Sequence, residues 1–249
     1  MKKRRHLKVF VFASFLVVLP LFYFFTVPDI SRLRNENPKK TAYMMHREKE
    51  WQMKGKKLKI HQSWVPLSGV SPYLVKAVLI GEDDKFWTHE GFDYEAIEKA
   101  IQKNLKMGKF KRGGSTISQQ LARNLYLSPE KSLLRKMREA LITWRIERAL
   151  PKKRILELYL NVVEWGEGIF GIEAASMHYY GKPASGLAPQ EAARLASVLP
   201  NPKRYDPIGH QPYVIARSHL IYHIMLQRGI VAPDLNEGTS DTGSSFREQ

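Results

Sequence analysis

The strongest constraint on this chain is an uncharged apolar run near its N-terminus. Residues 9–27 form 19 consecutive positions without a charged side chain, and nearly all of them are aliphatic or aromatic. An α-helix rises about 1.5 Å per residue, so a helix of this length crosses a hydrocarbon core of roughly 30 Å. The sequence therefore predicts one N-terminal transmembrane helix over residues 9–27.

The charges on either side of this run predict its orientation. Residues 1–8 carry five Lys and Arg side chains and no acidic one, whereas Asp29 and Glu36 interrupt the cations after the run. The more positive flank normally stays in the cytoplasm, which predicts a cytoplasmic tail over residues 1–8 and places the rest of the chain outside. A cleaved signal peptide is the alternative, but its apolar region usually has only about 7–15 residues, and the sequence around Val27 fits a cleavage site poorly.

Composition narrows the functions that the rest of the chain can serve. The 249 residues are 43% hydrophobic, enough to bury one compact core. The net charge of +16 implies attraction to nucleic acid, a membrane surface or a phosphorylated substrate. Nucleic acid is not expected, because no recognisable binding module is present and the predicted topology places the domain on the wrong side of the membrane. Without cysteine, the chain has no disulfide, thiolate metal site or cysteine nucleophile.

The chain after the apolar run divides into a linker, a domain and a tail. Residues 28–57 are polar and charged, which predicts a juxtamembrane linker that becomes helical around residues 41–53. Residues 58–235 are expected to form the compact domain. Residues 236–249, rich in Gly, Ser and Thr, are expected to form a flexible tail.

Apolar positions three and four apart predict that the domain is mainly α. Asp93 is expected to cap a helix over residues 94–107, and strand-like alternation is scarce. On one predicted helix, Leu134, Met137, Leu141 and Trp144 are expected to form an apolar stripe from which Glu139 and its basic neighbours point away. The further predicted helices cover residues 116–127, 131–150, 153–164, 171–180, 189–199 and 213–228.

Three segments concentrate residues that can do chemistry. Residues 81–93 place acids, a histidine and aromatic side chains around a helix end, although a solvated acidic turn before a helix cap gives the same pattern. In residues 112–124, a glycine pair precedes the start of a predicted helix. Helix N-termini bind phosphate readily, but a flexible loop followed by a helix cap has the same sequence pattern. Arg135 and Glu139 share a helix face, as an ordinary surface ion pair also would. Together, the carboxylates, the helix start and the cations suit transfer from a diphosphate.

In this order, the three segments resemble signature motifs of the peptidoglycan glycosyltransferases, family 51 of the glycosyltransferases. The first resembles Glu-Asp-x-x-Phe-x-x-His-x-Gly-x-Asp, the second Gly-Gly-Ser-Thr-Ile-Thr-Gln-Gln-Leu-x-Lys-Asn, and the third Arg-Lys-x-x-Glu. Residues 153–182 are similar to the fourth motif and residues 191–202 to the fifth. Because the chain ends soon afterwards, it looks like the monofunctional members, without the transpeptidase domain of class A penicillin-binding proteins.

The resemblance implies a lysozyme-like, mainly α glycosyltransferase domain and a set of site residues. Glu82 is expected to be the catalytic base. Glu139 is expected to orient the cations or to help hold a divalent ion, Mg²⁺ or Mn²⁺, although no cofactor is obligatory and no metal ligand is certain. The residues expected to bind the substrate and its diphosphate are Asp83, Phe86, His89, Gly113, Gly114, Ser115, Thr116, Gln119, Gln120, Arg123, Asn124, Arg135 and Lys136.

The resemblance also implies the substrates and the location. The growing glycan, linked through diphosphate to a polyprenol, would be transferred with inversion to the 4-hydroxyl of lipid II, the lipid-linked disaccharide, in the bacterial inner membrane. Penicillin-binding, divisome or elongation proteins are candidate partners, and no nucleic acid is expected. An apolar platform beside the membrane could include Ile60, Trp64, Val65, Val70, Tyr73 and Leu74, which core packing explains equally well.

Two alternatives remain at this point. A membrane-anchored, non-catalytic scaffold for wall synthesis would bind the precursor without polymerising it. A lysozyme-like enzyme that cleaves glycan would need a protonated carboxyl to release a sugar alcohol and would gain little from a set of cations. Release of polyprenyl diphosphate, as opposed to shortened glycan, distinguishes the polymerase from the cleaving enzyme.

Overall fold

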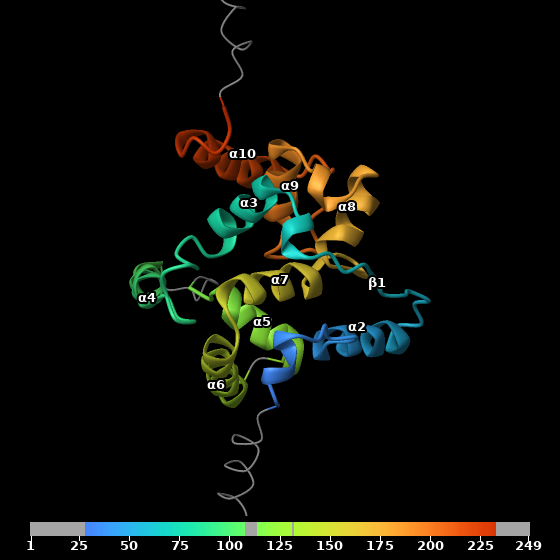
Figure 1. Ribbon diagram of the computed structural model, residues 1–249, viewed down its shortest axis with the longest axis vertical. Coiled ribbons are helices and arrows are strands. Elements are labelled where there is room, and N and C mark those ends of the chain that lie inside the picture. Colours follow the sequence, from blue (N-terminus) through green and yellow to red (C-terminus); the bar gives the residue numbers. More distant parts are fainter. Residues whose placement is uncertain (1–27, 108–113, 131, 233–249) are drawn as a thin grey trace, which may run out of the picture.

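The computed structural model describes residues 28–107, 114–130 and 132–232. This part of the chain is mainly helical, as the sequence predicts (Figure 1). The elements in chain order are η1 (Ser31–Arg34), α2 (Ala42–Met53), β1 (His61–Gln62), η2 (Leu67–Gly69), α3 (Pro72–Glu82), α4 (Tyr94–Met107), α5 (Ile117–Tyr126), α6 (Leu133–Ala149), α7 (Lys152–Val162), β2 (Glu164–Gly166), β3 (Ile169–Phe170), α8 (Ile172–Tyr180), η3 (Ala184–Gly186), α9 (Pro189–Val198) and α10 (Pro212–Gln227).

Several predicted segments lie outside the described residues. These are the cytoplasmic tail of residues 1–8, the transmembrane run of residues 9–27 and the C-terminal tail of residues 236–249. Among the residues that the structure does describe, no helix is both long enough and apolar enough to cross a bilayer.

Helices α5 and α7 occupy the centre of the molecule (Figure 1). Helix α7 is buried on most of its surface, and Ile155, Leu156, Leu158, Tyr159 and Leu160 have no exposed area. A helix that is apolar nearly all round belongs in a core, because it has neighbours on every side. Helices α2 and α6 pack on one side of this pair, and α3, α9 and α10 form a second layer on the other.

The small sheet was not predicted. Its strand order is β1-β3-β2, with β1 parallel to β3 and β2 antiparallel to it. Strands of two or three residues are too short to show an alternating pattern. The helix predicted over residues 153–164 accordingly ends at Val162, because Glu164 already begins β2.

The apolar stripe predicted on α6 lies away from Glu139, as expected, but the stripe faces outward and Glu139 faces the core. Leu134, Met137 and Trp144 are 61%, 48% and 46% exposed, whereas Glu139 is fully buried. The buried face carries Glu139 together with Ile142, Thr143 and Ile146. The residues of this face also have helical spacing. The charge of Glu139 can be buried because Arg135 and Lys136, on the same helix, neutralise it.

The segment of residues 28–57, predicted to be a juxtamembrane linker, packs on the domain. Ile30 and Leu33 join the main core, and α2, whose N-cap is Thr41, adds Met44 and Trp51 to a second cluster around Phe170. The backbone here is also held, since Arg154 donates to the carbonyl of Leu33 at 2.7 Å and Arg34 to that of Ala149 at 2.9 Å. The predicted helix around residues 41–53 is confirmed as α2.

The proposed apolar platform divides between the core and its edge. Val70 and Leu74 are buried in the main core, and Trp64, Val65 and Tyr73 pack against it. Ile60 packs against the second cluster. Core packing therefore accounts for these side chains, and the exposed apolar surface of the described chain lies elsewhere, most densely on α6.

Candidate active site

Glu82 is the last residue of α3, and its carboxylate faces the centre of the molecule. Only 10% of its side chain is exposed. Gln120 Nε2 on α5 donates to Glu82 Oε2 at 3.0 Å, and Arg217 Nη2 on α10 lies 3.4 Å from Glu82 Oε1. Burial raises the pKa of Glu82, while the contacts with Gln120 and Arg217 act in the opposite direction. A buried carboxylate whose pKa lies above the ordinary value is a stronger base than an exposed one.

Tyr159 fixes the amide that binds Glu82. Its hydroxyl donates to Gln120 Oε1 at 3.1 Å, which leaves the amide nitrogen to face the carboxylate. Burial, and after it the charge of Glu82, raises the pKa of Tyr159 well above its ordinary value. The hydroxyl therefore stays protonated and remains a donor, so the orientation of Gln120 does not change with pH in the physiological range.

Arg217 was missed by the sequence analysis. It lies on α10, beyond the five motifs, and donates to the carbonyl of Gly81 at 2.7 Å. This bond holds the guanidinium beside Glu82 from a helix far away in the sequence. Tyr159 was also not selected, although it lies within the segment that resembles the fourth motif. An i, i+4 pattern or a motif cannot reveal such pairings, because they arise only when α3, α5, α7 and α10 pack together.

Asp83 and His89 hold the neighbouring helix ends together. Asp83 Oδ2 accepts from the backbone N–H of Ile117 at 2.8 Å, and His89 Nε2 lies 2.9 Å from Asp83 Oδ1. The backbone N–H of Gly91 donates to His89 Nδ1 at 3.0 Å, so the ring proton belongs on Nε2 and is donated to Asp83. The pair thus joins the end of α3 to the start of α5 and sets the position of Glu82.

The start of α5 is already capped. Thr116 and Gln119 form a reciprocal capping box, with Gln119 N at 3.2 Å from Thr116 Oγ1 and Thr116 N at 3.0 Å from Gln119 Oε1. Thr116 also donates to the carbonyl of Gly91 at 2.7 Å, and both side chains are buried. These donors serve the fold in this structure and are not free to bind a phosphate.

The other residues that were predicted to bind the substrate near the start of α5 lie in different surroundings. Phe86 is fully buried, with Lys152 Nζ 4.6 Å from its ring centre, so it packs in the core. Gly114 has a φ of 92°, a conformation that favours glycine, and its neighbour Ser115 lies 3.5 Å from Lys136 Nζ. Gly113 lies outside the described residues.

Glu139 lies beneath two cations on α6. Arg135 Nη1 donates to Glu139 Oε2 at 2.8 Å, and Lys136 Nζ donates to Glu139 Oε1. The carboxylate is fully buried, while Arg135 and Lys136 are partly exposed. Glu139 therefore positions the two cations. Each of its oxygens accepts a hydrogen bond from one of these cations, and the divalent ion expected near Glu139 stays a prediction.

Arg123 is the cation of α5 that stays available. Within residues 28–107, 114–130 and 132–232, no hydrogen bond or ion pair is made by its guanidinium, which is partly exposed. Burial raises the pKa values of Glu82 and Tyr159, and Arg123 is among the charges that act against this rise, so it lies near both. Its neighbour Asn124 donates to the carbonyl of Gln120 at 3.0 Å and supports the helix.

The raised pKa of Glu82 predicts the acidic side of the pH profile. Because only the carboxylate form can accept a proton, kcat/KM should rise with pH through a pKa above the ordinary Glu value. Arg217 lowers this pKa, so Arg217→Gln should move the rise to higher pH. Initial rates of the catalysed reaction, measured across a pH series, give this shift. An unchanged midpoint in Arg217→Gln would show that Arg217 does not act on the titrating base.

The geometry defines an enzyme site of a particular class. A buried carboxylate with a raised pKa near an available arginine can take a proton from a hydroxyl while an anionic group is bound nearby, and Glu139 positions two further cations on α6, one of them beside the start of α5. The transglycosylase family profile matches residues 50–226. Since this match covers most of the chain, the protein belongs to the transglycosylase family.

Relatives with one shared name support this assignment. The chain is similar to the biosynthetic peptidoglycan transglycosylase of Nitrosospira multiformis, with 42% identity over 228 residues, which cover 92% of this chain and 98% of that protein. The proteins of the same name from Dechloromonas aromatica and Aromatoleum aromaticum are 52% and 54% identical over 170 residues. Each of these matches covers 68% of this chain and 74% of the relative.

Proposed function

We propose that this protein polymerises the lipid-linked disaccharide precursor of peptidoglycan into glycan strands. The observation that carries the proposal is the pairing of a buried, basic carboxylate at Glu82 with the available guanidinium of Arg123. The relatives' shared name, biosynthetic peptidoglycan transglycosylase, points to the same reaction.

In the proposed step, Glu82 takes the proton from the 4-hydroxyl of the acceptor disaccharide. The freed oxygen forms a bond to the anomeric carbon of the donor glycan from the face opposite the diphosphate. The bond from that carbon to the diphosphate oxygen breaks with its electron pair, which gives inversion. Because the diphosphate leaves as an anion, it needs no proton, and Arg123, Arg135 and Lys136 stabilise its charge.

The state of Glu139 favours transfer over hydrolysis. A glycan-cleaving enzyme of the usual kind needs two carboxyl groups, one protonated to release a sugar alcohol and the other able to act as a base or a nucleophile. Here both oxygens of Glu139 are bound by Arg135 and Lys136, and those of Asp83 by His89 and the backbone of Ile117, so neither carboxylate is placed to act as the second group beside Glu82. One base and several cations are sufficient for a reaction whose leaving group is a diphosphate.

A product analysis tests the proposed function. The purified full chain is incubated with fluorescently labelled lipid-linked disaccharide, and polymer, precursor and polyprenyl diphosphate are quantified. Polymer should appear with one polyprenyl diphosphate released per bond formed. Shortening of added glycan without diphosphate release would favour the cleaving enzyme, and precursor binding without either product would favour the scaffold.

Arg123→Gln should reduce kcat/KM for the precursor by roughly 10- to 100-fold, because one charge-assisted contact to the diphosphate is lost. Arg123→Lys should recover part of this loss, since it keeps the charge but not the planar fork. Gel-based initial rates at several precursor concentrations measure both variants. Equal losses in the Gln and Lys variants would show that charge at this position does not matter for the reaction.

We also propose that the exposed apolar face of α6 rests on the membrane. This face, formed by Leu133, Leu134, Met137 and Trp144, is continuous with a hollow of about 540 Å³ that Trp144, Arg145 and Arg148 share with Pro28. The described chain thus begins beside this helix, directly after the run predicted to cross the bilayer. Apolar side chains, an interfacial tryptophan and arginines are the groups that favour a bilayer surface.

The absence of cysteine from the chain allows a specific test of this face. Leu134→Cys, labelled with a polarity-sensitive fluorophore in the full chain, should be quenched by brominated lipids when the protein is reconstituted in vesicles. Leu220→Cys is the matched control, because Leu220 is similarly exposed on α10 at the other end of the molecule (Figure 1). Equal quenching at both positions, or at neither, would contradict the proposed membrane contact.

A further inference from the structure

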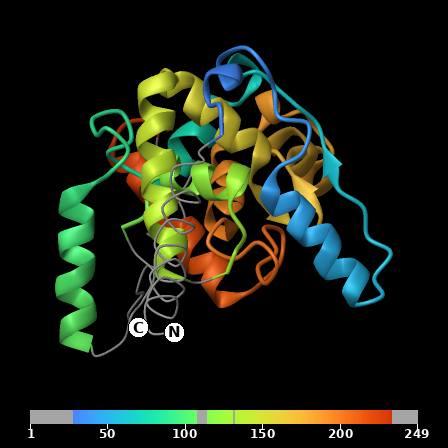
Figure 2. The ribbon, with the colours of Figure 1, turned by 90° about the horizontal axis from the view of Figure 1, so that it is seen from below.

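A second hollow lies on the side of the molecule away from α4 and α6. Its volume is about 630 Å³. Residues 57–59, the end of α8 and residues 202–206 line it, and His61 of β1 and Ile169 of β3 form part of it. Figures 1 and 2 both show β1 and α8 on the side opposite α4. The hollow is thus remote from the apolar face of α6.

The charges that line this hollow are mostly unneutralised cations. Lys57, Lys59 and Arg204 are exposed, and in the described part of the chain none of them forms an ion pair. The two acids that line it have other partners. Glu167 binds Lys56 at 3.1 Å and Asp206 accepts from the backbone N–H of Ile208 at 3.0 Å. The hollow therefore presents net positive charge to a ligand.

An aromatic pair connects this hollow to the candidate active site. Tyr205, in its wall, stacks on Tyr213 of α10 with ring centres 4.1 Å apart and planes at 13°. Tyr213 lies one turn before Arg217 on α10, and Arg217 Nη2 lies 3.4 Å from Glu82 Oε1, so the tyrosine pair begins beside the candidate catalytic carboxylate. A chain of sugar rings leaving Glu82 along this pair would enter the hollow.

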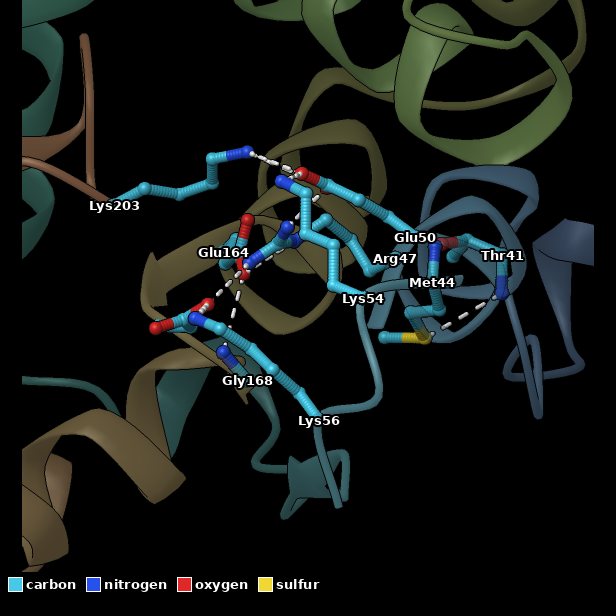
Figure 3. A network of polar contacts seen from close by, with 10 residues as sticks. Thr41, Met44, Arg47, Glu50, Lys54, Lys56, Glu164, Gly168 and Lys203 are labelled. Atoms are coloured by element: carbon cyan, nitrogen blue, oxygen red, sulfur yellow. Dashed lines mark hydrogen bonds and ion pairs between the residues drawn. The ribbon is translucent and has the colours of Figure 1, made fainter. Parts of the chain in front are cut away.

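A buried network holds the walls of the hollow in place (Figure 3). Arg47 Nε donates to Glu164 Oε1 at 3.0 Å, and the same oxygen accepts from the backbone N–H of Gly168 at 3.1 Å. The carbonyl of Gly168 then accepts from His61 N at 2.9 Å. At the rim, Lys203 reaches Glu50, which also binds Arg47. The network therefore holds in place the backbone segments that carry the exposed cations of the hollow.

We propose that this hollow binds the newly made glycan strand through the carboxylates of its peptide side chains. The inference rests on the proposed function, because only a polymerase would have such a strand beside Glu82. Exposed cations bind carboxylates by charge-assisted hydrogen bonds, and tyrosine rings present apolar faces to sugars. A strand held here after each addition stays on the enzyme for the next one. An anionic lipid headgroup offers similar charge, but the hollow lies away from the apolar face of α6.

Binding without turnover gives the first test. The full chain in detergent is titrated with soluble, lipid-free glycan strands that carry free peptide carboxylates. The double variant Lys57→Gln with Arg204→Gln should bind about five- to tenfold more weakly than wild type. The control variant Lys49→Gln with Lys76→Gln removes the same charge from exposed lysines that line neither hollow, and it should bind like wild type.

Two ligand controls define what is bound. Strands whose carboxylates have been amidated should bind wild type and the double variant equally weakly. Soluble dihexanoyl phosphatidylglycerol should bind wild type and the double variant alike. If the double variant loses the lipid but keeps the strand, the hollow is a headgroup site and the proposal fails. Unchanged strand binding in the double variant would also overturn it.

Product length gives the second test. At saturating precursor, the double variant should release strands several-fold shorter than those of wild type, while its initial rate of precursor consumption stays within about twofold. If wild type forms no polymer, the proposed function fails, but the strand titration still decides whether the hollow binds glycan. If polymer forms at normal length in the double variant, the hollow has no part in retaining the strand.

Discussion

Glu82→Gln is expected to lower the rate of glycan polymerisation by roughly 10²- to 10⁴-fold, the usual contribution of a general base. The amide keeps the size of the side chain but cannot take the proton of the acceptor hydroxyl. Because burial raises the pKa of Glu82, the charge of its carboxylate is less favourable in the folded than in the unfolded chain, and a neutral amide should not lower the stability at neutral pH. Polymer yield on gels, together with the Tm, measures both effects.

Glu90→Gln is the matched control for this experiment. Glu90 belongs to the same acidic segment but is exposed, and in the described part of the chain it forms no ion pair. Its variant should polymerise at the wild-type rate. A Glu82→Gln protein that folds normally and still polymerises within a few-fold of wild type would remove Glu82 from the role of base.

The largest effect on stability is expected from Arg47→Met, which should lower the free energy of unfolding by about 3–5 kcal/mol. Arg47 and Glu164 are both almost completely buried and are joined at 3.0 Å. Removal of the guanidinium leaves the Glu164 carboxylate buried without its main counter-charge. Chemical denaturation at pH 7 measures the loss. Lys54→Met, which removes an exposed partner of Glu50, should cost less than about 1 kcal/mol.

A second substitution distinguishes the buried charge from simple loss of packing. Arg47→Met with Glu164→Gln should recover at least half of the lost stability, since no uncompensated charge remains. Burial raises the pKa of Glu164 and Arg47 lowers it, so this pKa should rise further in Arg47→Met. A group whose pKa is raised by folding stabilises the folded state less as pH rises through that pKa. The defect should therefore shrink as pH falls through the raised pKa of Glu164 and be smallest near pH 4.5, the ordinary value. No recovery in the double variant and no pH dependence would indicate a packing defect instead.

Helix boundaries were predicted best where the sequence contains its own stop and start signals. Asp93 and Thr116 accept from the backbone three residues later and begin α4 and α5 as expected, and Gly181 ends α8 in a left-handed conformation. The faces of α6 could not be predicted in the same way. Two sets of apolar positions with helical spacing compete there, and which set enters the core depends on how Arg135 and Lys136 neutralise Glu139.

The sequence predicts the residues of the candidate site but not their contacts. The segment selected around Glu82 also supplies Asp83, Phe86 and His89, whose side chains join helices or fill the core. A motif selects residues that a site needs without separating those that touch the substrate from those that support the fold. Arg217 shows the opposite limitation: a residue outside every motif can lie beside Glu82, because its position depends on the packing of α10 against α3.

The packing of residues 28–57 on the domain leaves no loose linker between the predicted membrane span and the domain. Ile30 and Leu33 are buried, and the backbone around them is held by Arg154 and by the bond from Arg34 to α6. With the predicted span ending at residue 27, the domain would have no free tether on which to turn. The reacting centre would then stay at a constant height above the bilayer, and each added disaccharide would push the strand past a stationary enzyme.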